Sequence, residues 1–221
     1  MKNNFFIKFS SKIAILFVLL FITSCYTDTV DSFSKFTVQI PIYFYDYAVD
    51  RKAPSFSKDF TNLYEYAEYR DNKDRIDLAE IYQFTYWIDS LVHPETKLPF
   101  NPETDEMIFD YVKYTIIFMK PKSPFLIESQ DPNDFEVNTD YAEYVIEDKK
   151  NVKVTDYYRT PKNIMLMDEL DAKKISDILK VNPAFYVVSE YSKYQGQSQD
   201  PAYFPVLNVR SDLVIRLTIK L

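Results

Sequence analysis

The chain has 221 residues, a net charge of −7 and a single glycine. The acidic balance argues against a nucleic-acid partner, because a negatively charged protein repels phosphate backbones. One glycine excludes phosphate-cradling loops and dinucleotide-binding motifs, each of which needs two or more glycines.

The first 24 residues have the layout of a secretory signal. Lys2, Lys8 and Lys12 give a positive start, and an apolar run extends from Ile13 to Ile22. As a helix, this run measures about 15 Å, whereas the hydrocarbon core of a bilayer is about 30 Å thick. The run is therefore too short for a permanent membrane anchor, and we expect residues 1–24 to be removed.

The apolar run ends in Ile22-Thr23-Ser24-Cys25, an aliphatic residue, two small residues and the only cysteine of the chain. This segment resembles the lipobox of bacterial lipoproteins. The resemblance implies that Cys25 carries two or three acyl chains such as palmitate and becomes the N-terminus of a cell-envelope protein. Tyr26 is not the aspartate of an inner-membrane retention signal, which favours the outer membrane, on its periplasmic face or at the cell surface. The alternative is an ordinary cleaved signal in which Cys25 is coincidental.

Acylation of Cys25 would leave the mature chain without a free thiol. Together with the presence of a single histidine, His93, this excludes zinc sites of the Cys/His type, cysteine nucleophiles and disulfides. Removal of the leader leaves 197 residues, and loss of its three lysines changes the net charge to −10. We expect residues 25–34 to form a lipidated tether, residues 35–221 to form one domain, and no cofactor to be bound.

Alternation of apolar and polar residues predicts the first strand over 36–44. Pro41 falls on its outer face, which indicates an edge position. Residues 50–74 are polar and predicted to be irregular, with a short helix from Ser57 to Ala67 as an option. The stretch from Ile76 to Ile88 predicts a strand with a bulge near Glu80 and Ile81, and a helix is the competing interpretation.

The second half of the chain predicts further strands and one helix. Leu170, Ile175, Ile178 and Leu179 form an apolar stripe that predicts a helix near 168–181, with Asp168 as its cap. Asn182-Pro183 ends that helix. The predicted strands cover residues 107–119, 125–127, 141–146, 152–158, 164–167, 184–194 and 209–221. Many strands with one short amphipathic helix indicate a mainly β fold, a two-sheet β-sandwich.

One acidic run has the residue types of a calcium site. Asp131, Asn133, Asp134 and Glu136 crowd a proline-containing loop, and close oxygen ligands suit Ca²⁺. The run departs from the EF-hand pattern, because Phe135 replaces a ligand and the glycine is missing. We interpret it as a solvated turn and expect no metal, with calcium as the alternative.

Two other residue types could carry function. A pair of carboxylates is enough for glycoside hydrolysis, but with 33 acidic residues the sequence selects no pair. The aromatic content of 17% suits either a sugar-stacking surface or a compositional bias, and we favour the bias. Tyrosines that alternation or clustering marks as a weak recognition surface are Tyr43, Tyr45, Tyr47, Tyr64, Tyr66, Tyr69, Tyr191 and Tyr194.

These observations favour a non-enzymatic lipoprotein with a binding or structural role, whose ligand is a protein or a glycan. The alternative is a glycan-active hydrolase that uses a carboxylate pair. A cleft with two facing carboxyl groups would favour the enzyme, whereas a flat aromatic patch would favour the binding protein.

Overall fold

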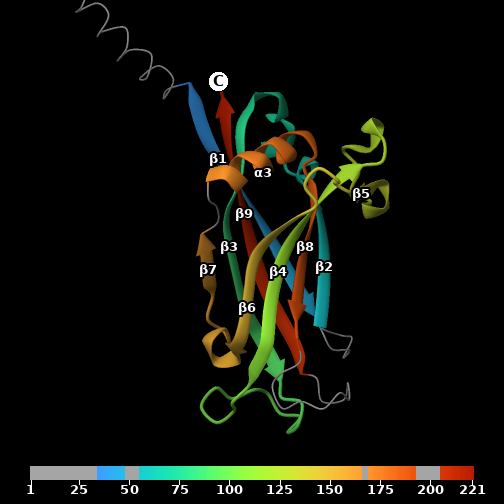
Figure 1. Cartoon of the computed structure of the whole chain (residues 1–221). Coiled ribbons are helices and arrows are strands. Elements are labelled where there is room, and N and C mark those ends of the chain that lie inside the picture. The colour runs from blue at the N-terminus through green and yellow to red at the C-terminus, as the bar shows by residue number, and fades with distance from the viewer. Residues whose placement is uncertain (1–33, 48–54, 166–168, 193–204) are drawn as a thin grey trace, which may run out of the picture.

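The computed structural model describes residues 34–47, 55–165, 169–192 and 205–221. They form a β-sandwich of two antiparallel sheets (Figure 1). The first sheet has the order β1-β9-β3-β7, with β1 at Lys35–Tyr47, β9 at Val206–Lys220, β3 at Ile76–Val92 and β7 at Lys162–Met165. In the second sheet, β4 (Ile108–Pro121) pairs with β8 (Ala184–Tyr191), β6 (Glu143–Lys153) and β5 (Phe135–Val137), and β2 (Ser55–Asn62) pairs with β8.

The strands with clean alternation behave as predicted. In β1, Ile40, Ile42 and Phe44 are buried while Pro41 faces outward, and β1 lies at the edge of its sheet. Proline in a sheet is largely confined to such edge strands. The last strand, β9, lies between β1 and β3, so the C-terminal strand is paired along both of its edges.

β3 is a strand, not the competing helix, and it is interrupted by bulges. Its pairing with β9 shifts register between Ile76 and Leu78, between Ile81 and Gln83, and between Ile88 and Ser90. The second shift confirms the predicted irregularity near Ile81. Because side chains alternate with period two, each such shift changes which residues of the strand face the core.

The predicted amphipathic helix is α3 (Glu169–Val181), while Asp168 lies outside the described residues. Its Ile175 and Leu179 are fully buried. β7 pairs with β3 only at residues 83–86, and α3 packs beside the earlier part of β3. There the buried Ser176 Oγ accepts a hydrogen bond of 3.0 Å from the backbone N–H of Ala79. The helix thus satisfies a polar group that would otherwise be left at the edge of the sheet.

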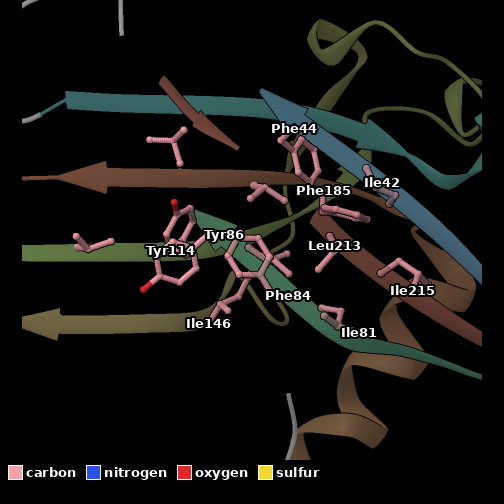
Figure 2. Packing of buried hydrophobic residues seen from close by; sticks show 14 of the residues in the cluster. Ile42, Phe44, Ile81, Phe84, Tyr86, Tyr114, Ile146, Phe185, Leu213 and Ile215 are labelled. Carbon is pink, nitrogen blue, oxygen red and sulfur yellow. The ribbon is translucent and has the colours of Figure 1, made fainter. Parts of the chain in front are cut away.

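The core between the two sheets is rich in aromatic rings (Figure 2). The ring of Tyr114 in β4 lies 4.8 Å from that of Phe84 and 4.6 Å from that of Tyr86, both in β3. Tyr86 also stacks on Tyr157 at 5.2 Å, and the hydroxyl groups of Tyr114 and Tyr191 are hydrogen bonded to each other. These rings join the two sheets, so much of the aromatic content is core.

An ion-pair cluster fastens one end of the first sheet. Asp77 of β3 lies 2.8 Å from Lys35 Nζ of β1 and 2.7 Å from Lys220 Nζ of β9. Hydrogen bonds from Lys220 and Lys35 lower the pKa of Asp77 to about 2. All three side chains are partly exposed, so the cluster orients the strand ends more than it stabilises the fold.

Several local predictions were wrong. Residues 55–62 form β2 instead of irregular chain or helix, and Pro124–Leu126 is a 3₁₀ turn instead of a strand. The short α2 (Ala67–Arg70) and a 3₁₀ turn at Leu63–Glu65 follow β2, and β5 was not predicted. The remaining 3₁₀ turns are Lys73–Arg75, Pro132–Asp134 and Val154–Asp156.

In the described part of the chain, no helix is both long and apolar enough to cross a bilayer.

Candidate binding surface

A row of side chains crosses the four strands of the first sheet. Pairing places Tyr43 of β1 opposite Asp212 of β9, Asp212 opposite Thr85 of β3, and Thr85 opposite Asn163 of β7. Directly opposed residues on one face have Cβ atoms about 4.5–5.5 Å apart. The four residues therefore form a continuous line on the face of the sheet that points away from the core.

A second row lies beside the first. Here Tyr45 of β1 is opposite Arg210 of β9, which is opposite Trp87 of β3. Tyr43 is 73% exposed and Tyr45 is 52% exposed, while Trp87 is half-buried. Together with Asp212, these residues line a shallow hollow of about 420 Å³. We call Tyr43, Tyr45, Trp87, Arg210 and Asp212 the aromatic platform.

A β-bulge places Trp87 on this surface. Before the register shift at Ile81/Gln83 the odd-numbered Ala79 and Ile81 face the core, and after it the even-numbered Phe84 and Tyr86 do. Without the extra residue, Trp87 would share the core-facing side with Ile81. The bulge therefore turns the only tryptophan of the chain outward, beside Arg210.

Arg210 is held in place by its neighbours. Its guanidinium carbon lies 5.3 Å from the centre of the Tyr45 ring, and its Nε lies 3.9 Å from a carboxylate oxygen of Asp89. A cation over a ring face is attracted by the negative π surface. Both contacts keep the guanidinium on the platform and leave further N–H groups for a ligand, because guanidinium has five donors.

Asp212 is the acidic group of the hollow. Burial raises the pKa of its carboxyl group above the usual range, although the nearby Arg210 acts in the opposite direction. In the same part of the face, Thr85 Oγ1 donates to Asn163 Oδ1 at 2.8 Å, and Gln83 Nε2 donates to Thr85 Oγ1 at 3.0 Å. Hydrogen-bonding side chains therefore adjoin the rings along the first row.

We predict that Asp212→Asn stabilises the protein at neutral pH. A carboxyl group whose pKa is higher in the folded than in the unfolded state costs stability as pH rises above the unfolded value of about 3.8. At pH 7 the variant should unfold at a higher temperature than the wild type, and near pH 3 the two should coincide. Thermal unfolding followed by circular dichroism at both pH values measures this. If Asp212→Asn is less stable than the wild type at pH 7 but equally stable near pH 3, the assigned burial of Asp212 is contradicted.

The acidic run 131–136 is occupied by contacts within the protein. Asp131 Oδ1 accepts from the backbone N–H of Asn133 at 2.9 Å, and Asp134 Oδ2 accepts from Ser129 Oγ at 2.6 Å. Glu136 pairs with Lys120 at 3.3 Å. Over the described ranges, no three Asp, Glu, His or Cys side chains gather in a way that could hold a metal. The calcium alternative therefore gains no support from these contacts.

The tyrosines singled out in the sequence separate into two groups. Tyr43 and Tyr45 are exposed as alternation predicts, but Tyr64, Tyr69 and Tyr191 are buried. The Tyr69 hydroxyl donates to the backbone oxygen of Leu179 at 2.8 Å, so this ring fastens α2 to the end of α3. Tyr66 is partly buried against the core, and the side chains of Tyr47 and Tyr194 are outside the described part.

His93 has a local structural contact. It is buried in the turn after β3, where its Nδ1 accepts from the backbone N–H groups of Glu95 and Thr96 at 3.3 and 3.4 Å. The histidine therefore stabilises the turn that contains it. Cys25 lies outside the described residues, so its lipidation stays a prediction.

A second hollow, of about 410 Å³, lies near the loop that precedes β4. Its lining includes the carboxylates of Glu103, Asp105 and Glu106, together with Lys153 of β6. Asp105 Oδ2 accepts from the backbone N–H of Asn101 at 2.7 Å, which is a contact that shapes the loop. All three acids come from one short stretch, in contrast to the platform, which is assembled from three strands.

No protein-family model matches this chain, and no curated protein matches it. Among solved structures, one of Desmodium yellow mottle tymovirus is 8% identical, with a TM-score of 0.30, over 85% of this chain and 89% of that chain. One of turnip yellow mosaic virus is 10% identical, with a TM-score of 0.29, over 85% and 96% of the two chains. VP1 of Trichodysplasia spinulosa-associated polyomavirus is also 10% identical, with a TM-score of 0.32 and the same coverage. Likenesses of this size carry no argument about function.

Proposed function

We propose that the protein is a lipid-anchored, non-enzymatic binding protein of the cell envelope, and that the aromatic platform is its binding surface. The lipobox-like segment ending at Cys25 supports the anchor, with the outer membrane favoured because Tyr26 follows it. The platform supports the binding role. The mature chain meets the membrane through its lipid and uses no nucleic acid and no cofactor.

One observation carries the binding role: two tyrosines and the only tryptophan gather on one outward face. Exposed aromatic rings of this size are expensive to leave in water, and tyrosine, tryptophan and arginine are enriched at binding hot spots. Here the two tyrosines lie on β1, Trp87 on β3 and Arg210 on β9. Paired strands hold these side chains more rigidly than loops would. Asp212 adds a partly desolvated carboxylate, a feature that also favours a functional site.

The hydrolase alternative is less well supported. Acid-pair catalysis needs two carboxyl groups on either side of a scissile bond. The lining of the platform hollow contributes one, Asp212. The second hollow contributes Glu103, Asp105 and Glu106, but all from one loop segment. Release of shorter products from an oligosaccharide would establish the enzyme and overturn the non-enzymatic role.

Hydroxyl-radical footprinting in the native envelope tests the proposal. Intact cells and purified lipoprotein in detergent micelles are labelled in parallel, and oxidation of each aromatic residue is quantified by mass spectrometry. We expect Tyr43, Tyr45 and Trp87 to be labelled several-fold less in cells, because a ligand covers them there. Phe125, which is 97% exposed and lies on the Pro124–Leu126 turn, is the matched control and should be labelled equally.

The footprint has two informative outcomes. Protection confined to the platform supports a binding surface, whatever the chemistry of the ligand. If Tyr43, Tyr45 and Trp87 are each labelled as strongly in cells as in micelles, as Phe125 is, the platform is unoccupied in the envelope. That result would overturn the proposed function.

A further inference from the structure

We propose that the aromatic platform binds a neutral hexopyranose chain, with one sugar ring stacked on Tyr43 or Trp87 and its hydroxyl groups bonded to Asp212 and Arg210. This inference rests on the proposed function and names the class of ligand.

The rings supply the stacking contact. A pyranose ring presents a face of C–H groups with small positive partial charge, and an aromatic ring presents a negative π face. Tyr43 is exposed over most of its surface, and Trp87 is half-buried beside the same hollow. The platform is thus open to a flat ligand, whereas an apolar protein anchor generally needs a deep desolvated pocket.

The polar side chains of the platform favour a ligand with hydrogen-bonding groups over a purely apolar ligand. The Asp212 carboxylate accepts hydrogen bonds and the Arg210 guanidinium donates them. Both belong to β9, which lies between β1 with its two tyrosines and β3 with Trp87. Sugar hydroxyl groups both donate and accept, so one ring can satisfy both side chains. Charge-assisted hydrogen bonds of this kind are about twice as strong as neutral ones.

The charge balance favours a neutral sugar over an acidic one. Arg210 lies near two carboxylates, Asp212 and Asp89, and the other arginine of this face, Arg216, pairs with Glu80 at 2.7 Å. Both of these arginines, in the described part of the face, therefore have carboxylates beside them. The mature chain as a whole would also repel a polyanion, because its expected net charge is negative.

The size of the hollow fits a segment of a longer chain. About 420 Å³ is at the lower end of the ~300–1,000 Å³ typical of small-ligand pockets, and the platform is open along its sheet. Such a site can accommodate about one or two sugar rings while the rest of the glycan continues past it. Because few groups hold the ligand, we expect dissociation constants between about 10 μM and 1 mM.

Trp87 makes the test direct, because it is the only tryptophan of the chain and lies in the hollow. Purified lipoprotein in detergent micelles is titrated with maltohexaose, cellohexaose, mannohexaose and hexa-N-acetylchitohexaose, each up to 10 mM. We expect at least one of these neutral chains to shift the tryptophan emission with saturation. Hexagalacturonate is the anionic comparison and should bind at least tenfold more weakly than the best neutral chain.

Variants link the fluorescence signal to the platform. Tyr43→Ala removes a stacking ring and Asp212→Ala removes the hydrogen-bond acceptor, and each should weaken binding about tenfold. Variants of Trp87 have no tryptophan emission, so calorimetry measures their binding. Trp87→Ala should weaken binding more than Trp87→Phe, which keeps an aromatic ring. Phe125→Ala removes an even more exposed ring elsewhere and should bind as the wild type does.

The outcomes separate this inference from the proposed function. Saturable binding of a neutral chain that Tyr43→Ala and Asp212→Ala both weaken supports it. Absence of binding to all four neutral chains, preferential binding of hexagalacturonate, or binding unaffected by both variants would overturn it. If the native-envelope footprint protects the platform while the four chains do not bind, the platform has another ligand class and the binding role stands.

Discussion

Replacing Cys25 with alanine will transfer the protein from the detergent phase to the aqueous phase in Triton X-114 partitioning. At about 0.8 kcal/mol per buried CH₂, two long acyl chains contribute on the order of 20 kcal/mol to membrane binding, whereas one chain alone holds a protein only marginally. No substitution of a surface residue could change partitioning by a comparable amount. The folded domain should be unaffected, because the expected tether precedes β1.

Ser24→Ala is the matched control for this experiment, because it keeps a small residue before Cys25. This variant should partition into detergent as the wild type does, and both should show the same far-ultraviolet circular dichroism as Cys25→Ala. Mass spectrometry of the mature protein should find acyl chains on the Cys25 sulfur. Equal partitioning of Cys25→Ala and wild type, or an unmodified thiol, would contradict the anchor.

Tyr114→Ala should destabilise the fold more than any surface substitution. The side chain is fully buried and contacts the rings of Phe84 and Tyr86 from the opposite sheet (Figure 2). It also contacts the ring of Tyr191 in its own sheet. Removing a buried aromatic ring costs about 3–5 kcal/mol, a large part of the 5–15 kcal/mol that stabilises a typical domain. For a chain of this size we expect the melting temperature to fall by about 10 °C.

Two further variants make that result specific. Tyr114→Phe keeps the ring and removes the hydrogen bond to the Tyr191 hydroxyl, so it should cost about 1–2 kcal/mol. Tyr43→Ala makes the same chemical change as Tyr114→Ala at an exposed position and should change stability by less than about 0.5 kcal/mol. Urea unfolding followed by circular dichroism measures all three. A cost below 1 kcal/mol for Tyr114→Ala would show that this ring is not part of the core.

The long strands could be predicted because alternation is a local property of the sequence. β1 and β9 bury one face and leave the other towards solvent, so apolar residues recur at every second position. This recurrence indicates which side chains face the core. β2 could not be predicted in this way. Its sequence, Ser55–Asn62, is largely polar and its strand structure comes from pairing with β8, which is more than a hundred residues away in the chain. Pro124–Leu126 is apolar enough for a strand, but a proline at the first position suits a tight turn.

The sequence predicted only part of the candidate site. Alternation placed Tyr43 and Tyr45 outward, but it gave no reason to group them with Arg210, Asp212 and Trp87. That grouping depends on the register between β1, β9 and β3, and on a bulge that changes the facing of Trp87. Clustering of tyrosines in the sequence pointed elsewhere, to Tyr64 and Tyr69, which are core residues.

The position of β1 has a mechanical consequence. Its Lys35 end continues from the expected tether, and its other half carries Tyr43 and Tyr45. If a captured glycan is pulled away from the cell, tension between the lipid and the ligand runs lengthwise along β1. All 13 residues of β1 are paired with β9 by bonds that lie across this direction. The part of the load that reaches Arg210 and Asp212 of β9 crosses the β1–β9 ladder in shear, so several of its hydrogen bonds resist the load together.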